Sequence, residues 1–441
     1  MINYCVFYYD CKSMIYYIYY NTGIYEETNT RPLNIHTFEH SRLTKISIND
    51  KLTKGISLEN ILKEYSEKMQ IWRDELLNSK SLILSFDYFL EFKKENGEIF
   101  KNTNETNILR FFNKYSSKIY TNETFDKITW KEYLWFEKPY SGSLNKHIKG
   151  IYNCLGFDFK SSYPTLLSSN LILNGQKKTF FMPIKQGSFY KLKELKQNLI
   201  YGLYHVKIIS DSEDFKFIFN FKTDTNIYTH YDIEFCRKYQ TQFNISIELI
   251  IDDEPNGLLY KVNKIIDGFQ VFNSWFSRLN DLKEELPNNG LIKMLSSSIW
   301  GYLSKSNKRY YNDSELDLKP DIKFDYYDNE EINYLCLNEK DNVDELTTDY
   351  LLIDKSQPYS KNYRLKPFIT ALQRVIIAEI CIKIGIKKVI RINTDSICFN
   401  KDLLTDNDIK NIYKISPSFI PELKTTGKFE ILHTNKFIPV I

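Results

Sequence analysis

The sequence lacks the features that mark a membrane protein or a disulfide-rich secreted protein. No apolar run approaches the roughly 18 residues that span a bilayer, and the N-terminus has no basic segment that would open an export signal. The seven cysteines are scattered and form no C-x-x-C pair, which favours reduced thiols over a zinc site or a disulfide framework. We therefore expect an intracellular protein, of unknown compartment, without a membrane partner.

An excess of charge of one sign is also absent. With 59 basic and 56 acidic residues among 441, the net charge is only +3, so any nucleic-acid site must come from local clustering. Hydrophobic residues make up 42% and charged residues 26%, as in soluble globular proteins, and the length suggests about three domains.

Periodicity and turn residues predict several elements that carry no chemistry of their own. Near the N-terminus we expect strands and one helix, at Val6–Tyr9, Tyr16–Tyr20, Leu82–Phe86 and, for the helix, Leu58–Leu77. Further on we expect a small α/β unit and three longer helices, with strands at 198–209 and 244–251 and helices at 231–239, Tyr260–Leu286, from Leu291 onward, and Ile369–Ile384.

The stretch Gly156–Pro164 is predicted to be a strand, a sharp turn and the start of a helix. Asp158 falls at the strand tip, and Pro164 suits a first helical position. A carboxylate at this point is well placed to hold a metal ion, and the small Ser161 and Ser162 allow backbone to approach a phosphate. Asp and Ser are also ordinary turn residues, so the stretch alone fits a bland strand–turn–helix equally well.

Two further stretches offer groups that would complement such a carboxylate. Residues 388–399 are predicted to form a hairpin with a tight turn near Asn393–Thr394, which places Asp395 at its tip. In a helix from Leu291 the 3.6-residue period puts Lys293, Ser297 and Trp300/Gly301 on one face. These residues offer a cation, a hydroxyl, an aromatic plane and a glycine without a side chain. Together they suit a nucleoside triphosphate.

Taken in order, these stretches resemble the motifs of family B DNA polymerases. Asp158–Pro164 resembles D-x-x-S-L-Y-P, Lys293–Gly301 resembles K-x-x-x-N-S-x-Y-G, and Arg391–Ser396 resembles Y-x-D-T-D-S. Their surroundings are similar too, at Tyr140–Ser143 (Y-x-G-G), Phe368–Arg374 and Gly427–Glu430. The long intervals between the three motifs leave room for two insertions, as in the protein-primed branch known from linear plasmids, phages and viruses.

The resemblance implies an α+β fold with the palm and fingers of a right-hand polymerase, a reduced or degenerate exonuclease-like domain and a truncated thumb. The expected divisions are an exonuclease-like remnant at 1–137, palm at 138–197, a first insertion at 198–262, fingers at 263–305, a second insertion at 306–364, palm at 365–424 and the start of a thumb at 425–441.

The resemblance also implies a role for each residue. Asp158, Asp395 and the carbonyl of Phe159 would hold two Mg²⁺ ions, for which Mn²⁺ can substitute, for nucleotidyl transfer. The incoming deoxynucleotide would meet Phe159, Ser161, Ser162, Tyr163, Arg278, Lys293, Ser297, Trp300 and Gly301, with Tyr163 beneath the sugar. The DNA template and primer would meet Tyr140, Gly142, Thr394, Ser396 and Lys428. A terminal protein would be a further partner, as the primer.

The sequence departs from the family pattern at several positions. Arg391, Asn393, Ser297 and Trp300 replace Tyr, Asp, Asn and Tyr, and Arg391 has no role in the family scheme. The D-x-E of proofreading members is absent, since none of the aspartates before residue 130 is followed two positions later by Glu, so we expect no 3′–5′ exonuclease activity. The alternative is a degenerate polymerase that binds nucleic acid or a replication partner without catalysis; the lack of a paired-Asp hairpin makes a reverse transcriptase less favoured.

Overall fold

The computed structural model describes the backbone of five strands within residues 1–103, and residues 104–117, 125–139, 142–219, 225–285, 290–327, 329, 331–342, 347–356 and 362–440. The chain forms two compact units, and the boundary between them falls twice within helical segments. One unit comprises Met1–Ser116 and Ser277–Tyr302, and the other comprises Ser117–Phe276 and Leu303–Ile441.

The first unit contains a five-stranded sheet in the order β3-β2-β1-β4-β5. The strands are β1 (Tyr4–Asp10), β2 (Ile15–Tyr20), β3 (Tyr25–Thr28), β4 (Thr44–Ser47) and β5 (Ile56–Ser57). Strands β1 to β3 pair antiparallel, whereas β4 runs parallel to β1, so the expected strands at Val6–Tyr9 and Tyr16–Tyr20 are confirmed. The helix expected at Leu58–Leu77 and the strand at Leu82–Phe86 lie outside the described residues.

Besides the part of α10 (Gly268–Glu285) from Ser277 onward, the described helices of this unit include three shorter ones, and α4 packs against α11. They are α4 (Asn104–Tyr115), α11 (Gly290–Ser297) and α12 (Ile299–Leu303), which ends at the unit boundary. The helix expected from Leu291 is therefore present, but it is interrupted at Ser298 rather than continuous to Gly301.

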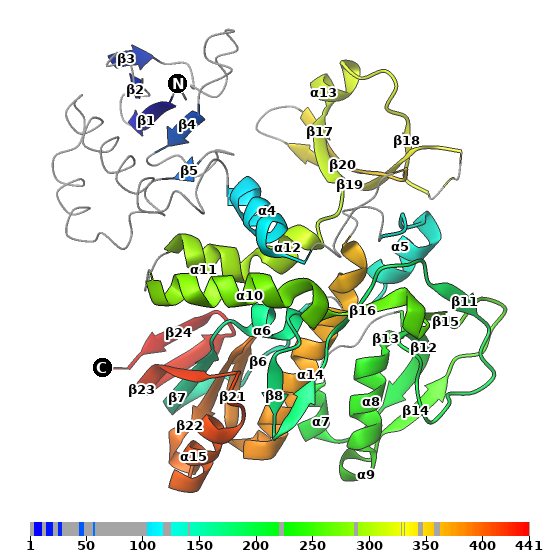
Figure 1. Cartoon of the computed structure of the whole chain (residues 1–441), viewed down its shortest axis with the longest axis vertical. Helices are drawn as coiled ribbons and strands as arrows, with labels where there is room; N and C mark the ends of the chain where they lie inside the picture. Colours follow the sequence, from blue (N-terminus) through cyan, green and yellow to red (C-terminus); the bar gives the residue numbers. More distant parts are fainter. Residues whose placement is uncertain are drawn as a thin grey trace. The chain divides into compact units, whose positions relative to one another are not determined.

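The second unit is built on a six-stranded antiparallel sheet (Figure 1). In the order in which they pair, its strands are β24 (Lys436–Pro439), β23 (Pro421–His433), β7 (Gly150–Phe159), β22 (Ser396–Asn400), β21 (Val389–Asn393) and β6 (Asn145–His147). Strand β7 is central, because β22 pairs along one of its edges and β23 along the other.

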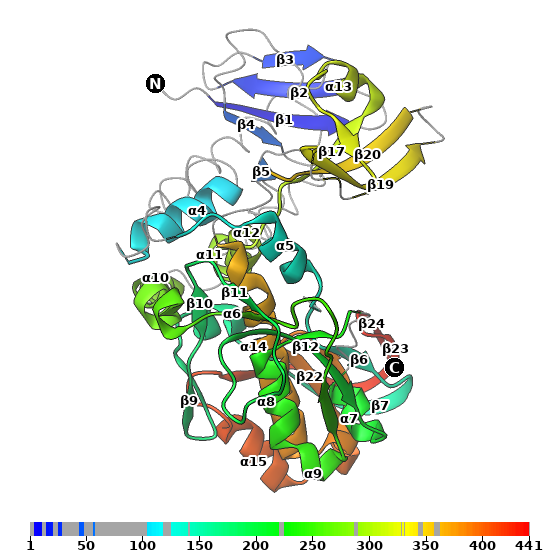
Figure 2. The ribbon, with the colours of Figure 1, turned by 90° about the vertical axis from the view of Figure 1, so that its right-hand side faces the viewer.

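Alternation of side chains along β7 gives the sheet two different faces. Leu155, Phe157 and Phe159 are buried on one face, where the Phe159 ring stacks on Phe419 with 4.6 Å between centroids. The helices of this layer are α14 (Lys366–Ile384) and α15 (Asp406–Lys414). Nearly every residue of α14 is buried, since it lies between the sheet and helix α8 (His230–Lys238), as Figures 1 and 2 show.

The other face of the sheet carries a smaller apolar cluster. Cys154, Cys398 and Ile431 form a small buried cluster there, and Phe437 of β24 packs against it. Side chains of β23 and β24 thus contribute to this cluster. Asp158 lies beyond it, at the end of β7.

A small α/β unit is inserted between β7 and α14. Its strands are β11 (Ser188–Tyr190), β12 (Gly202–Ile209), β13 (Ile227–Thr229), β14 (Ser246–Leu249) and β15 (Gly257–Leu259). Its helices are α7 (Glu213–Ile218), α8 and α9 (Gln240–Phe243). A capping box between Thr229 and Asp232 begins α8, which confirms the helix expected at 231–239.

The helix expected from Tyr260 begins eight residues later. Residues 262–264 form a 3-10 turn and β16 (Ile265–Asp267) pairs with β10 (Phe181–Pro183), so α10 spans Gly268–Glu285. The Asp267 carboxylate accepts a hydrogen bond from the Phe269 amide, and a Cβ at Gly268 would lie 2.0 Å from the Leu167 carbonyl oxygen. The apolar residues of this segment therefore suggested a helix, whereas residues 265–267 form the strand β16 because they pair with β10.

The remaining elements are short. Helix α6 (Ser162–Leu167) follows β7 and leads to the hairpin β8 (Leu171–Leu173) and β9 (Gln176–Lys178). A separate sheet between α12 and α14 has its own small core of Tyr311, Cys336 and Leu352. Its elements are β17 (Lys308–Asn312), α13 (Asp313–Asp317), β18 (Phe324–Asp325), β19 (Tyr334–Asn342) and β20 (Thr347–Asp354). Within the described chain, none of the helices has the length and apolarity to cross a membrane.

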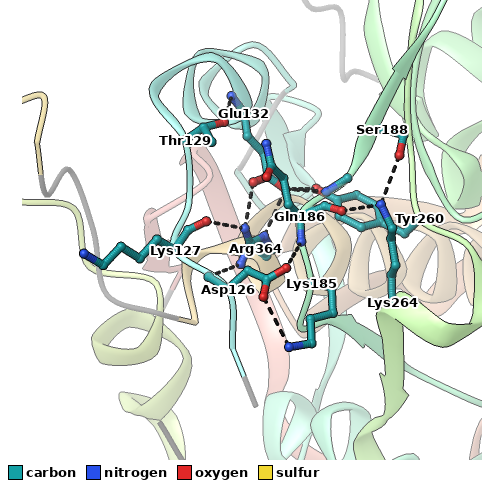
Figure 3. A network of polar contacts seen from close by, with 11 residues as sticks. Asp126, Lys127, Thr129, Glu132, Lys185, Gln186, Ser188, Tyr260, Lys264 and Arg364 are labelled. Carbon is teal, nitrogen blue, oxygen red and sulfur yellow. Dashed lines mark hydrogen bonds and ion pairs between the residues drawn. The ribbon is translucent and has the colours of Figure 1, made fainter. Parts of the chain in front are cut away.

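A buried polar network ties the start of α14 to helix α5 (Trp130–Glu137), as Figure 3 shows. Arg364 donates to both carboxylate oxygens of Glu132, at 2.9 and 2.7 Å, and neither side chain is exposed to solvent. Tyr260 and the amide of Gly187 donate to the same carboxylate, and Arg364 also donates to the Asp126 carbonyl. The charges of Arg364 and Glu132 are thus paired and hydrogen-bonded, as buried charges require.

Candidate active site

The structure brings Asp158 and Asp395 together at the end of the six-stranded sheet. Asp158 on β7 lies directly opposite Ser396 on β22, and the Phe159 amide donates to the Asp395 carbonyl at 3.0 Å. Thr394 and Asp395 form a two-residue turn, because Asn393 pairs with Ser396 and Thr394 has a left-handed φ of 59°. The hairpin predicted from the sequence is therefore present, with Asp395 at its tip.

The two carboxylates interact electrostatically. Burial, and then the charge of Asp158, raises the pKa of Asp395 from 3.8 to about 6. Glu422 on β23 also lies opposite Asp158, but its carboxylate pairs with Lys424 at 2.7 Å and with Lys160 at 3.4 Å. The charge of Glu422 is thus compensated by these two lysines.

This donor set fits a hard divalent cation. Carboxylate and carbonyl oxygens are the ligands that Mg²⁺ prefers, and Mn²⁺ accepts the same ones. Across the described residues, no group of three or more His, Cys, Asp or Glu side chains is arranged to hold a metal. A metal at Asp158 and Asp395 would therefore depend on these two side chains, on backbone carbonyls and on ligands from outside the chain.

The turn after β7 places three of the predicted residues beside the carboxylates. Ser161 has a left-handed φ of 54° and precedes α6, in which Ser162 and Tyr163 are buried. The Ser162 hydroxyl has no hydrogen-bond partner among the described residues. Burial raises the pKa of Tyr163, and Asp395 contributes in the same direction, so the phenol lies within electrostatic reach of that carboxylate.

Helix α14 fastens both the hairpin and the loop before β6. Gln373 donates to the carbonyl of Thr394 at 2.5 Å, and Arg374 donates to the carbonyl of Gly142 at 2.9 Å. Arg374 also forms an ion pair with Asp232 of α8 at 3.3 Å, with both side chains 1% exposed. Gly142 is thus held near the turn of Asp395. The sequence placed Gln373 and Arg374 in a family-like helix but did not predict these contacts. Their only signal was that they are polar residues on an otherwise apolar helix.

Contacts with the C-terminal hairpin explain Arg391 and Asn393, the two positions at which Arg391–Ser396 departs from the family motif. Arg391 donates to the carbonyl of Thr434 at 2.5 Å and lies 4.8 Å from the ring centroid of Phe437. Asn393 donates to the side-chain oxygen of Asn435 at 3.1 Å. Both side chains therefore bind the turn between β23 and β24.

Other predicted residues belong to the other unit. Arg278, Lys293, Ser297, Trp300 and Gly301 belong to the first unit, so their place beside the carboxylates stays a prediction. There, Arg278 forms an ion pair with Glu285 at 2.8 Å, and the Ser297 hydroxyl donates to the Lys293 carbonyl at 3.0 Å.

Of the residues predicted to contact DNA, some lie beside the two carboxylates and others do not. Ser396 and Thr394 lie beside Asp158 and Asp395, whereas Tyr140 lies outside the described residues. Lys428 pairs with Asn153, five residues along β7 from Asp158, which corresponds to roughly 17 Å. Lys428 is therefore not part of the cluster around the two carboxylates.

Comparison with known proteins gives a fold and no family. No family model matches the sequence, and no curated protein does. Among solved structures, Phi29 DNA polymerase complexed with primer-template DNA and incoming nucleotide substrates is similar over 99% of this chain and 86% of that chain, with a TM-score of 0.57 and 11% identity. Phi29 DNA polymerase complexed with single-stranded DNA is similar over 81% of this chain, with a TM-score of 0.52 and 14% identity.

In that second match the chain spans 57% of the polymerase's own length. At such low identities the similarity concerns the fold alone. The chain therefore has a mixed α/β fold that resembles the fold of Phi29 DNA polymerase.

Proposed function

We propose that the protein is a template-directed DNA polymerase that adds deoxynucleotides to a primer 3′-hydroxyl. The observation that carries the proposal is the pairing of Asp158 and Asp395 on adjacent strand tips, in a fold that resembles Phi29 DNA polymerase. In this proposal the six-stranded sheet is the palm of a family B enzyme, α10 and α11 belong to the fingers, and residues 425–441 begin a thumb.

Each group at the strand tips has a definite task in this reaction. Asp158 and Asp395, with the carbonyl of Phe159, would hold two Mg²⁺ ions, which when bound activate the primer hydroxyl and stabilise the leaving pyrophosphate. Gln373 fixes the turn that carries Asp395. Tyr163 would lie beneath the sugar, and its ring would exclude a 2′-hydroxyl.

The first unit would supply the remaining contacts to the nucleotide. Lys293 and Arg278 would neutralise the triphosphate, and Trp300 and Gly301 would support the new base pair. Catalysis of this type depends on positioning and charge stabilisation rather than on covalent chemistry. The proposal has three further parts. The primer is a terminal protein, the template is the genome of a linear plasmid or virus, and the enzyme does not proofread.

A primer-extension assay tests this function directly. With Mg²⁺ or Mn²⁺ and all four dNTPs, we expect the purified protein to extend a primed DNA template, and we expect Asp158→Ala to remove the activity. Asp402→Ala is the matched control, because Asp402 is exposed and lies near the other end of β7. A parent protein that binds DNA without extending the primer would instead support a degenerate polymerase, which the substitutions at Arg391 and Asn393 favour.

Binding of Mg²⁺ should depend on pH through Asp395. Because the pKa of this carboxyl is about 6, its protonated form predominates below that pH and competes with the metal. We expect the affinity to fall by about tenfold for each pH unit below 6 and to level off above pH 7. Calorimetric titration with Mg²⁺ between pH 5 and pH 8 measures this, and an affinity that is constant over that range would contradict it.

A further inference from the structure

The turn that carries Asp395 begins with a residue in an unfavourable backbone conformation. Thr394 has a left-handed φ of 59°, which glycine adopts freely and a β-branched residue rarely does. Of the described non-glycine residues with positive φ, Thr394 alone is β-branched. The turn is also tight, because Asn393 and Ser396 pair on either side of it. The surroundings of Thr394 must therefore hold a conformation that its own side chain disfavours.

Both peptide groups of Thr394 form hydrogen bonds with other elements. Its amide donates to the Leu144 carbonyl at 3.1 Å and to the side-chain oxygen of Asn145 at 3.2 Å. Its carbonyl accepts a hydrogen bond of 2.5 Å from the side-chain amide of Gln373. Asn145 begins β6 and Gln373 lies on α14, so the turn is fixed from two sides. We call Asn145 and Gln373 the threonine clamp.

The surroundings of Gln373 indicate that it is present for this contact. The side chain is fully buried, and within the described part of the chain its one hydrogen bond is the bond to Thr394. The side-chain oxygen of Gln373 has no partner among those residues. The opposite amide orientation would set this oxygen against the Thr394 carbonyl, so the contact decides the orientation. A buried acceptor without a partner lowers stability, so the packing of α14 does not by itself explain a glutamine here.

Hydrogen bonds fix the backbone on both sides of Asp395. The peptide that precedes Asp395 contains the Thr394 carbonyl, to which Gln373 donates. The peptide that follows contains the Asp395 carbonyl, which accepts from the Phe159 amide at 3.0 Å. Phe159 directly follows Asp158, so the position of one carboxylate relative to the other depends on these two bonds. Metal ligands must lie within about 0.2 Å of their ideal distances, so a small shift of this turn would weaken metal binding.

We propose that Asn145 and Gln373 are positioning residues, which set the metal affinity of Asp158 and Asp395 by holding Thr394 in its left-handed conformation. This inference rests on the proposed function, because that function places a metal at the two carboxylates. The threonine clamp acts through the backbone of the turn and requires no contact with the metal or the nucleotide. Removal of a residue that supports a metal ligand typically lowers metal affinity by about 10- to 100-fold.

Metal binding to the purified protein tests this inference without any need for catalysis. In calorimetric titration with Mg²⁺ at pH 7.5, the affinity of Gln373→Met should be lower than that of the parent by about tenfold or more. Asn145→Ala should cause a smaller loss, because the Leu144 carbonyl still accepts from the Thr394 amide. Asn145 is exposed, so this variant keeps the test decisive if Gln373→Met does not fold. In extension assays, raising the Mg²⁺ concentration should restore the kcat of Gln373→Met, while the KM for primer–template should equal that of the parent.

A second substitution tests whether the conformation of Thr394 is the reason for the loss. Glycine adopts the left-handed conformation without a steric cost. In a Thr394→Gly background, the loss of affinity caused by Gln373→Met should therefore be smaller by at least about threefold than in the parent. Ile380→Val is the matched control, because it removes one methyl group from the buried part of the same helix and leaves the polar contacts of the turn in place. This control should bind Mg²⁺ like the parent.

The possible outcomes separate the threonine clamp from the proposed function. Unchanged affinity in the clamp variants, an equal loss in Ile380→Val, or the same loss with and without Thr394→Gly would overturn the inference and leave the proposed function intact. Conversely, a parent protein whose Mg²⁺ affinity depends on the threonine clamp but which extends no primer would refute the proposed function and support the clamp. A parent protein that binds no Mg²⁺ would overturn both.

Discussion

Asp395→Asn should abolish nucleotidyl transfer and at the same time stabilise the metal-free protein. Loss of one metal ligand should lower the rate by at least about 10³-fold, because the metals supply several kcal/mol of transition-state stabilisation. The folded protein holds the Asp395 proton up to a pKa of about 6, whereas the unfolded chain releases it near 3.8. The parent therefore loses stability between about pH 4 and pH 6 and does not regain it above.

Asparagine removes this loss, so at pH 7.5 in EDTA the variant should be more stable by on the order of 2 kcal/mol. At pH 4 the two proteins should unfold alike. Single-turnover incorporation and thermal unfolding at both pH values measure the two effects, and added Mg²⁺ should stabilise the parent alone. Asp402→Asn serves as the control on an exposed carboxylate. A variant that keeps its activity, or that is less stable than the parent at pH 7.5, would rule out the proposed role of Asp395.

Arg364→Met should destabilise the second unit by about 3 to 5 kcal/mol. The substitution removes both hydrogen bonds to the fully buried Glu132 and leaves that carboxylate without a cation. Methionine roughly preserves the length of the side chain, so the loss reports mainly the uncompensated charge. The start of α14 would also lose its link to the Asp126 carbonyl. Chemical denaturation at pH 7.5, monitored by tryptophan fluorescence, measures the effect.

The double variant Glu132→Leu/Arg364→Met should recover part of this stability, since it removes the unpaired charge together with its partner. Recovery should be incomplete, because Tyr260 and the Gly187 amide donate to Glu132 and would lose their acceptor. Lys216→Met, which breaks an exposed pair with Glu213, should leave the unfolding midpoint where it is. A single variant as stable as the parent would show that the network contributes little.

The sequence alone was sufficient to predict the structural features that depend on residues close together in the chain. Strand alternation with a turn signal located the tips at Asp158 and Asp395, and an apolar run closed by Gly385 located α14 to within three residues at its start. Local propensity and turn chemistry set these elements, so a short window of sequence contains the necessary information.

Features that depend on distant partners were not predictable. The α10 helix begins at Gly268 because β16 pairs with β10, a contact that periodicity does not reveal. Arg391 and Asn393 were unexplained until their partners in the turn of β23 and β24 were visible. The roles of Gln373 and Arg374 likewise follow from backbone carbonyls of Thr394 and Gly142, which no side-chain pattern encodes.

The central place of β7 has a consequence for synthesis of the chain. Both of its partners come from the C-terminal part, and the His147–Thr434 contact joins residues 287 positions apart. At about 5 to 20 residues per second, the ribosome needs roughly 15 to 60 s to supply the second partner of that contact. Until β22 is made β7 has no partner for either edge, and until β23 is made one edge stays unpaired; an apolar strand in that condition is prone to aggregation. The strand that carries Asp158 is thus made early and completed last, so folding of this sheet requires the entire C-terminal hairpin.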